Sequence, residues 1–479
     1  MWSMSRKPRK AQVGMVGLGV MGRNFLLNMA EHGFSAAGYD KEPAKLSLLH
    51  SEAMGLPVQW AGDVKSFLEL LEPPRAVILL VPAGPVVDSV IRDLLPQLEI
   101  GDLLVDAGNS HFTDTDIRGK TLQAKGVHYM GMGISGGEAG ARYGPSLMPG
   151  GPQAAYQRIQ TILETCAAQV EGEPCVTYLG PGSAGHYVKM VHNGIEYGMM
   201  QLIAETYDLL RRGLGLGDGE IGDIFERWSQ SDLNSYLVEI TADIIRKTDE
   251  ITGKPLVEVV QDSARQLGTG MWASQDAMEL HVPTPTIDTA VAMRNLSALQ
   301  DIRFAMGGKY GGRIQPNIGK SSDILEHAGR ALYAGFILTY AQGFSLMGAA
   351  SHTYAYQLDL AAVARIWRGG CIIRSSLLEH IRSSFERQPN LLYLLLDEAL
   401  GEAVDVRLPS LRHIVQVGAE VGLPLPAFMA LLASFDSLRS THLPANLIQA
   451  QRDYFGAHTY ERVDRRGIFH TEWSKDIGA

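Results

Sequence analysis

The chain has 479 residues, 46% of them hydrophobic and 20% charged, which is typical of a globular protein and long enough for two or three domains. Its formal net charge of −10 argues against a nucleic-acid-binding protein, because there is no excess of basic residues to neutralise phosphates. Cys166, Cys175 and Cys371 show neither CxxC nor metal-ligand spacing. The sequence therefore predicts no disulfide framework and no metal site, and it favours a reducing, cytoplasmic environment.

The basic start "MWSMSRKPRK" lacks the apolar core of a signal peptide, and we expect a disordered tail there. From Gln12 to about Gly180, short apolar runs such as "QVGMVG", "SAAGYD", "RAVILLV" and "DLLVDAG" alternate with amphipathic stretches. Such alternation is typical of a parallel sheet with helices on both faces. Residues 1–182 are therefore predicted to form an α/β, Rossmann-like domain.

A glycine-rich turn follows the first predicted strand, where Gly17, Gly19 and Gly22 have G-x-G-x-x-G spacing. In such a turn the first glycine permits a tight bend, the second admits a pyrophosphate, and the third lets the next helix pack closely. The motif is weak by itself, but here a strand precedes it and a helix follows. The residues expected to contact a dinucleotide in this turn are Gly17, Leu18, Gly19, Val20, Met21 and Gly22.

The second predicted strand ends at Asp40, eighteen residues after Gly22. A carboxylate at this point accepts hydrogen bonds from ribose hydroxyls and repels a 2′-phosphate. Lys41 follows, but Glu42 offsets its charge. We therefore expect NAD as the cofactor, with NADP less favoured.

Two loops at the carboxyl edge of the predicted sheet carry polar groups. "DAGNS" presents Asn109 at the edge where open α/β sheets bind ligands. The glycine-dense stretch Gly131–Gly151 contains Ser135, Gly136 and Gly137, whose backbone N–H groups could face an anion.

The segment "GHYVKMVHNGIEYGMMQ" predicts a helix with an unusual polar stripe. Lys189, Asn193 and Glu196 fall within an arc of about 60°, flanked by His192 and Tyr197. In a dry cleft the pKa of a lysine falls and that of a glutamate rises, so the pair could act as base and acid. From the spacing alone, a solvated helix face explains the stripe equally well.

After Gly180 strand patterns nearly vanish, and residues 183–440 are predicted to form a large all-helical domain. The stretch from Ala331 to Leu358 has no charged residue but is too polar for a membrane span, so we expect a helix buried in the protein or in a subunit interface. Residues 441–479 are predicted to form a short helix followed by an extended C-terminal tail.

The chain resembles the decarboxylating 6-phosphogluconate dehydrogenases over nearly its whole length, in the long, dimeric form of the β-hydroxyacid dehydrogenase group. The resemblance runs through "GLGVMGRN", "ILLVPAG", "DAGNS", "SGGEAGARYGPSLMPGG", "GHYVKMVHNGIEYGMMQ", "WRGGCIIRS" and "LIQAQRDYFGAHTYE". It implies oxidative decarboxylation of a 3-hydroxy sugar acid to a ketopentose derivative and CO2, and it implies that Val81 and Ala83 lie at the cofactor.

The resemblance also implies roles. Lys189 matches the base that removes the C3 hydroxyl proton, and Glu196 matches the acid that protonates C1. Ser135, Gly136, Gly137, His192 and Asn193 match groups that hold the carboxylate and the C3 hydroxyl, and Asn109 lies between cofactor and substrate. The phosphate is held by residues matching Tyr197, Thr269 and Arg294, and by Arg452 and His458 from the tail of a partner subunit. A homodimer with exchanged tails is therefore expected.

The chain departs from the family pattern at several positions. Asp40-Lys41-Glu42 stands where the NADP form has Asn-Arg-Thr, which agrees with an NAD preference. Pro82, Leu267 and Met271 each replace a family lysine. The position of Leu267 helps to hold the phosphate, and loss of a cation there would leave a charge of about −1.5 to −2 undercompensated.

These departures leave alternatives open. Arg265 or another residue could compensate, with 6-phosphogluconate as substrate; otherwise the substrate carries a less charged tail, as in 6-deoxy-6-sulfogluconate or gluconate. A dehydrogenase without decarboxylation and a non-catalytic NAD-binding dimer are the other candidates. Retention of Lys189 and Glu196 argues against the latter. No nucleic-acid or membrane partner is expected.

Overall fold

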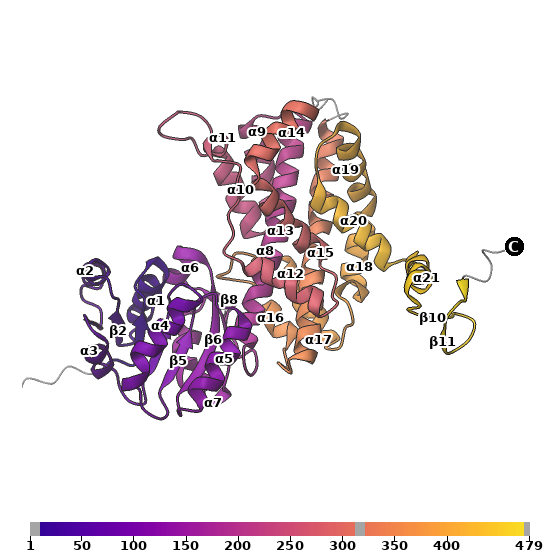
Figure 1. The fold of residues 1–479 in the computed structure, drawn as a ribbon. Coiled ribbons are helices and arrows are strands. Elements are labelled where there is room, and N and C mark those ends of the chain that lie inside the picture. The colour runs from indigo at the N-terminus through magenta and orange to yellow at the C-terminus, as the bar shows by residue number, and fades with distance from the viewer. Residues whose placement is uncertain (1–9, 312–320, 474–479) are drawn as a thin grey trace, which may run out of the picture. The chain divides into compact units, whose positions relative to one another are not determined.

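A computed structural model describes residues 10–311 and 321–473, and the expected N-terminal tail lies mostly outside these ranges. The chain divides into two compact units, residues 1–428 and 429–479 (Figure 1). The first unit contains the sheet and nearly all the helices.

The first unit begins with a seven-stranded sheet in the order β3-β2-β1-β4-β5-β6-β7. Its strands are β1 Val13–Val16, β2 Ala36–Tyr39, β3 Val58–Ala61, β4 Ala76–Leu79, β5 Leu103–Asp106, β6 His128–Ser135 and β7 Ser146–Gly150. The strands from β1 to β6 pair in parallel, as the sequence predicts, whereas β7 runs antiparallel to β6. The connection between them, residues 136–145, is shorter than the crossover of a dozen residues that a parallel pair requires.

Helices cover both faces of this sheet, and strand side chains alternate between two cores. One core joins Met15 and Val105 to α1 and α7, and the other joins Val16 and Leu104 to α3, α4 and α5. The helices of this region are α1 Val20–Glu31, α2 Pro43–Glu52, α3 Val64–Glu69, α4 Pro85–Leu94, α5 Phe112–Gln123, α6 Gly137–Tyr143 and α7 Gln153–Cys166. The predicted Rossmann-like fold is therefore confirmed.

A short hairpin, β8 Gln169–Val170 and β9 Glu173–Pro174, leads to the helical part, which starts directly after the predicted boundary at residue 182. Its helices are α8 Ala184–Asp208, α9 Asp218–Ser229, α10 Tyr236–Arg246, α11 Leu256–Val259, α12 Thr269–Glu279, α13 Pro285–Ser297, α14 Gln300–Tyr310, α15 Ser321–Thr353, α16 Leu360–Ile366, α17 Leu377–Arg387, α18 Glu398–Asp405, α19 Leu408–Val421 and α20 Pro426–Leu438. Among the described residues, no strand longer than an isolated bridge interrupts this series. The predicted large helical domain is confirmed.

Helix α8 joins the two parts of the first unit, because it packs against β6 and β7 of the sheet and against the helices α12, α13 and α15. The uncharged segment predicted from Ala331 forms most of α15, and nearly all its side chains up to Ala350 are buried. The apolar character of α15 thus arises from packing inside the protein. In the described ranges, no helix combines the length and hydropathy needed to cross a bilayer.

The second unit holds the end of α20, then α21 Ala445–Gly456 and an antiparallel pair, β10 Tyr460–Glu461 and β11 Ile468–Phe469. The tail is therefore a short helix and a small hairpin, where a simple extended segment was expected. The buried Asp453 holds it together by accepting hydrogen bonds from the backbone N–H groups of Thr459 and Thr471 and from Trp473 Nε1. His470 Nδ1 lies 2.8 Å from the same carboxylate.

Candidate active site

The glycine-rich turn between β1 and α1 has the form that a dinucleotide requires. Gly17 has φ +95°, and a Cβ there would lie 2.5 Å from the carbonyl oxygen of Leu80. A Cβ on Gly22 would lie 1.9 Å from the carbonyl oxygen of Gly17, so both positions need glycine for close packing. Gly19, the N-cap of α1, faces open space instead. The free approach to Gly19 and the helix N-terminus fit a pyrophosphate.

Asp40 lies beside this turn and is tied to it. Its Oδ2 accepts the backbone N–H of Leu18 at 2.8 Å, and its Oδ1 accepts that of Glu42 at 2.9 Å. A neighbouring pocket of about 450 Å³ is lined by Gly17, Asp40, Lys41, Val81 and Pro82, among others. Four predicted cofactor residues thus share one pocket next to the turn.

Both lysines at this pocket are paired with carboxylates. Lys41 Nζ lies 2.8 Å from Asp93 Oδ2, and Lys45 Nζ lies 2.9 Å from Glu42 Oε1 and 3.6 Å from Asp40 Oδ2. The three carboxylates outnumber the two ammonium groups, so the pocket has no unneutralised cation among these residues. Asp93 was not predicted, because it comes from α4, more than fifty residues after the turn.

The other predicted cofactor residues differ in exposure. Val20 is exposed, Met21 packs its side chain against the core beside α1, and Ala83 is half-buried next to Pro82. The side chain of Met21 is thus partly used by the core, which leaves its backbone to face a ligand.

The turn after β5 exposes Asn109 and is braced by the buried Asp106. Asp106 accepts hydrogen bonds from Gly108 N at 3.1 Å, Ser110 Oγ at 2.6 Å and Tyr129 OH at 2.8 Å. Arg118 Nη1 lies 3.5 Å from the same carboxylate. This bracing keeps Asn109 at the carboxyl edge of the sheet, and the aspartate that opens "DAGNS" was the available sequence signal for it.

The loop after β6 begins with two glycines whose positive φ angles favour glycine. Gly136 has φ +132° and Gly137 has φ +64°, conformations that L side chains rarely adopt. Ser135 Oγ lies 3.1 Å from His192 Nε2 and accepts the backbone N–H of Ile372 at 3.3 Å. The loop is therefore held between α8 and the "WRGGCIIRS" segment, whose role the sequence reading left open.

Lys189 and Glu196 lie on one face of α8, and the burial of Lys189 argues against a solvated helix face. Lys189 is 6% exposed and lies so close to β6 that a Cβ on Gly133 would come within 2.3 Å of Lys189 Cβ. Burial lowers the pKa of the Lys189 amine, although the charge of Glu196 opposes this. Burial raises the pKa of Glu196, opposed by the charges of Lys189 and Arg294.

A chain of hydrogen bonds joins three elements beside this pair. His192 Nδ1 lies 2.9 Å from Asn193 Oδ1, and Asn193 Nδ2 donates to Thr269 Oγ1 at 2.9 Å. Burial and the nearby charge of Lys189 hold the pKa of His192 well below its usual value. The imidazole is therefore neutral, donating from Nδ1 and accepting from Ser135 at Nε2, and the chain runs from β6 through α8 to α12.

Further along α8, the guanidinium group of Arg294 lies over the ring of Tyr197. Arg294 Cζ lies 3.5 Å from the centre of the Tyr197 ring, and Arg294 Nη1 donates to the carbonyl of Arg265 at 3.1 Å. Met271 packs against Tyr197, so an apolar contact occupies the place of one family lysine. Leu267 is 88% exposed in this chain.

Arg452 and His458 belong to the second unit. Arg452 Nη1 donates to Gln449 Oε1 at 3.1 Å, and His458 is exposed, with its ring 6.0 Å from that of Phe455. The first unit thus brings together Ser135, Lys189, His192, Asn193, Glu196, Tyr197, Thr269 and Arg294 by its own packing.

A Rossmann-like sheet with a pyrophosphate-adapted turn, followed by a helix that carries a buried lysine and a half-buried glutamate, defines a nicotinamide-dinucleotide-binding protein of the oxidoreductase type. Residues 12–180 match the NAD binding domain of 6-phosphogluconate dehydrogenase, and residues 185–473 match the C-terminal domain of 6-phosphogluconate dehydrogenase. The chain therefore belongs to the 6-phosphogluconate dehydrogenase family.

Individual relatives match over their full length. The "6-phosphogluconate dehydrogenase, NADP(+)-dependent, decarboxylating" of Bacillus subtilis is 48% identical over 97% of this chain and 100% of its own. The "6-phosphogluconate dehydrogenase, decarboxylating" of Escherichia coli is 46% identical over 97% and 99%. The 6-phosphogluconate dehydrogenase of Plasmodium falciparum, solved as apoprotein, with NADP+ and with 6-phosphogluconate, superposes with a TM-score of 0.93 at 43% identity, covering 96% of this chain and 100% of that chain. The relatives from Bacillus subtilis and Plasmodium falciparum are both described with NADP+, which argues against the predicted preference for NAD.

Proposed function

We propose that this protein catalyses the oxidative decarboxylation of 6-phosphogluconate to a ketopentose phosphate, CO2 and a reduced nicotinamide cofactor. The observation that carries the proposal is the pair on α8, a buried Lys189 and a half-buried Glu196, in which removal from water shifts the pKa of Lys189 down and that of Glu196 up. Those directions suit a base and an acid that work at the same pH. The full-length relatives named for this reaction support it.

Lys189 is the proposed base. Its neutral amine takes the proton of the substrate's C3 hydroxyl, and the nicotinamide, when bound, accepts the hydride that leaves C3. Gly133 allows the amine to reach this position, because any larger residue on β6 would displace the Lys189 side chain. The resulting ammonium ion can then polarise the C3 carbonyl oxygen while the C1 carboxylate is lost as CO2.

Glu196 is the proposed acid for the second half of the reaction. Loss of CO2 from the 3-keto acid leaves an enediol, which must gain a proton at the former C2 of the substrate, the carbon that becomes C1 of the ketopentose. The carboxyl of Glu196 retains its proton to higher pH than an exposed glutamate, because partial burial raises its pKa. It lies two helical turns from Lys189, so the two groups can act on neighbouring carbons of a substrate laid along α8.

The remaining groups orient the substrate. The N–H groups of Gly136 and Gly137, together with Ser135, are suited to the C1 carboxylate, and Asn193 and His192 to the C3 hydroxyl. Asn109, braced from Asp106, is placed to lie between cofactor and substrate. The protonation state of His192 affects Lys189, because the positive charge of an imidazolium ion would lower the pKa of the Lys189 ammonium group further.

For the phosphate end, Arg294 supplies a cation, held by its stacking on Tyr197, and Thr269 supplies a hydroxyl at the start of α12. We also propose that Arg452 and His458 reach this end from the tail of a second copy, so that the enzyme is a homodimer. The domain division belongs to the same proposal: residues 1–182 bind the dinucleotide, 183–440 bind substrate and dimerise, and 441–479 form the exchanged tail.

For the cofactor, we propose a preference for NAD over NADP, in contrast to the NADP(+) named for the relative from Bacillus subtilis. The support is electrostatic: Lys41 and Lys45 are both paired with carboxylates, and Asp40 follows the second strand, where a carboxylate suits ribose hydroxyls. A 2′-phosphate would meet three carboxylates and no spare cation from these residues. Asp93→Asn should free Lys41 and raise the ratio of kcat/KM for NADP to that for NAD; Asp301→Asn, on the exposed surface of α14, is the control.

Initial rates with 6-phosphogluconate, 6-deoxy-6-sulfogluconate and gluconate, each with NAD and NADP, test the whole proposal. The expected result is the fastest turnover with 6-phosphogluconate and NAD, with one CO2 released per reduced cofactor. Reduced cofactor without CO2 would indicate a simple dehydrogenase, and no turnover of any sugar acid would indicate a non-catalytic dimer. A clear preference for the sulfonate or for gluconate would reject the phosphate assignment.

Leu267 provides a sharper test of the substrate's far end. If the phosphate reaches the start of α12, Leu267→Lys should lower KM for 6-phosphogluconate several-fold, because a phosphate monoester carries about −1.5 to −2 charges. Leu392→Lys is the matched control, since Leu392 has the same exposure of 88%. Equal kinetics in both variants would place Leu267 outside the phosphate site.

A further inference from the structure

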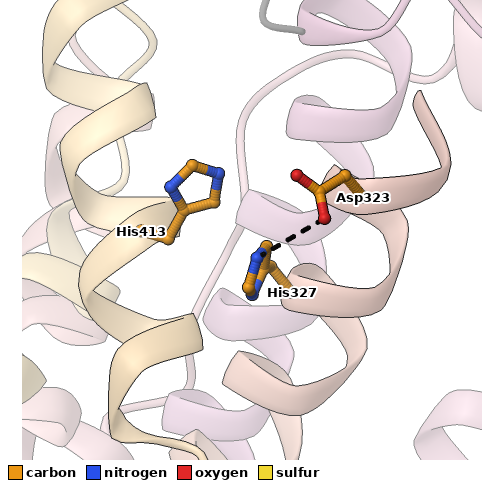
Figure 2. Close-up of side chains that lie close together, drawn as sticks. All are labelled: Asp323, His327 and His413. Atoms are coloured by element: carbon orange, nitrogen blue, oxygen red, sulfur yellow. Dashed lines mark ion pairs between the residues drawn. The ribbon is translucent and has the colours of Figure 1, made fainter. Parts of the chain in front are cut away.

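Two helices of the first unit bring together three side chains that have no place in the proposed reaction. Asp323 and His327 lie on α15, and His413 lies on α19 (Figure 2). One potential ligand atom from each residue lies within 4.8 Å of the other two. His327 Nε2 is 3.8 Å from Asp323 Oδ1, and the two imidazole ring centres are 4.5 Å apart.

The packing of the two helices creates this cluster. Asp323 and His327 are four residues apart and therefore share one face of α15. Their neighbours Ile324 and Ala328, and the neighbours of His413 on α19, Leu411 and Ile414, are buried. The cluster thus sits at the rim of a tight apolar contact, where Asp323 is exposed and both histidines are half-buried. This arrangement leaves a way in for an ion from solvent.

A serine orients one imidazole. Ser410 is buried one turn before His413, and its Oγ lies 3.0 Å from His327 Nδ1. When Nδ1 donates its proton to Ser410, the lone pair of Nε2 points toward the carboxylate of Asp323. A hydrogen bond of this kind on the far nitrogen is what fixes the ring of a metal-binding histidine.

The charges around the cluster favour a cation. His327 Nε2 and an oxygen of Asp323 lie 3.8 Å apart, too far for a hydrogen bond, and both are atoms that can donate an electron pair to a metal ion. The nearest cation on α15, Arg330, is directed elsewhere: its Nη2 donates to the carbonyl of Val406 and its Nη1 lies 3.8 Å from Glu326. A divalent ion bound among the three groups would accept electron pairs from atoms that otherwise face one another.

We propose that Asp323, His327 and His413 form a Zn²⁺ site that clasps α15 to α19. Two imidazoles and one carboxylate are a ligand set that zinc accepts, with a water molecule in the fourth position. Tetrahedral bonds of about 2.0–2.1 Å place ligand atoms roughly 3.3 Å apart. Small side-chain rotations would bring the three groups to that spacing, because Asp323 is free to move in solvent and His413 lies at the rim.

The site joins segments that are eighty-six residues apart, and neither the sequence spacing nor the cysteine pattern indicates it. Its role is structural: the ion would hold the beginning of α15, the helix whose later turns pack on α8. Because the ligands take no part in the proposed reaction, filling the site should stabilise the fold and leave kcat largely unchanged.

The binding test compares the full-length protein with His327→Ala, His413→Ala and the control His380→Ala, which alters an exposed histidine on α17. After removal of metals by EDTA and dialysis, each protein is titrated with ZnCl2 against a chromogenic chelator. The wild-type chain and His380→Ala should each bind one equivalent of Zn²⁺ more than either ligand variant binds. The affinity for this additional equivalent should be micromolar or tighter. Equal stoichiometry in all four proteins would overturn the proposal, and any weaker binding to tail histidines would be common to all.

Two further measurements separate binding from loss of folding. Zn²⁺ at a hundredfold excess over its dissociation constant should raise the midpoint of thermal unfolding by about 3 °C in wild type and His380→Ala, whereas Mg²⁺ should have no effect. Co²⁺ should give the visible absorption of a tetrahedral complex in these two proteins only. A shift of equal size in His327→Ala and His413→Ala, both folded by circular dichroism, would also reject the site.

Discussion

Lys189 and Glu196 lie two turns apart on one face of α8, and each opposes the effect of burial on the other's ionisation. The carboxylate raises the pKa of the amine that burial lowers, and the amine lowers the pKa of the carboxyl that burial raises. The two groups therefore titrate as a linked pair, and a change at one should be measurable at the other.

The first prediction concerns the pH dependence of this pair. Glu196→Gln removes the negative charge that raises the pKa of Lys189, so that pKa should fall further. Because the base must be neutral, the acidic limb of the profile of kcat/KM against pH should move to lower pH. The turnover number should also fall by about 10²–10⁴-fold, since general acid catalysis is lost. Glu239→Gln, on α10, is the control. If the acidic limb does not move in Glu196→Gln, the ionisation seen in that limb does not belong to Lys189.

The second prediction concerns Gly133. A Cβ at this position would lie 2.3 Å from Lys189 Cβ, so Gly133→Ala should displace the lysine by a few tenths of an ångström or more. We expect kcat to fall by about 10–100-fold, because small displacements of a catalytic group are costly, while the affinity for the dinucleotide stays unchanged. Gly219→Ala, where a Cβ meets open space, should have no effect on turnover. Normal kcat in Gly133→Ala would show that β6 does not set the position of the base.

The third prediction concerns Glu205, which is buried and accepts the backbone N–H groups of Ala427 and Phe428 at the start of α20. Burial raises its pKa from 4.5 to about 7. A raised pKa means that the protonated form stabilises the fold below the unfolded value of 4.5, and this stabilisation is lost as the pH rises through about 7.

Denaturant unfolding at several pH values measures this effect. Between pH 5 and pH 8, the wild type should lose up to about 3 kcal/mol relative to Glu205→Gln, at 1.36 kcal/mol per unit of pKa. The amide variant keeps an acceptor for the helix N-terminus but cannot ionise. A free-energy difference that stays constant with pH would contradict the prediction.

The fourth prediction concerns Asp453 in the tail. Removal from water raises the pKa of Asp453, but the hydrogen bonds from His470, Thr471, Trp473 and Thr459 outweigh this effect and lower it to about 2. Its carboxylate therefore stabilises the tail above the ordinary value of 3.8, and that contribution is lost as the pH falls through about 2.

Asp453→Asn should loosen the tail at neutral pH. Hydrogen exchange in peptides covering residues 453–473 should become faster, and activity should fall if the tail supplies Arg452 and His458 to a second copy. Asp464→Asn alters an exposed carboxylate of the same tail, paired with Arg462, and serves as the control. If Asp453→Asn kept full activity although the amide hydrogens of its tail exchanged rapidly with solvent, this result would count against a dimer in which each tail completes the partner's site.

Features set by local spacing could be predicted from the sequence. The alternation of apolar runs predicts the parallel strands, and the glycines at 17, 19 and 22 predict the turn that Asp40 closes. The stripe of Lys189, Asn193 and Glu196 follows from the helical repeat. Each of these depends on residues that are close in the chain, where backbone geometry alone decides which side chains share a face.

The burial and the contacts of these side chains depend on the tertiary structure. Only the packing of α8 on β6 buries Lys189, and only the approach of α12 brings Thr269 to Asn193. The pairing of Lys41 with Asp93 and the antiparallel β7 were likewise beyond reach of the sequence pattern. The cluster of Asp323, His327 and His413 shows the same limit.

The sequence by itself determined the class of fold, the dinucleotide turn and the types of group that carry the chemistry. The tertiary structure decided their ionisation and their partners. The physical reason is that pKa values and long-range contacts depend on how much water is removed around a group and on which distant segment removes it. In this chain that information resides in the packing of α8 against the sheet and the neighbouring helices.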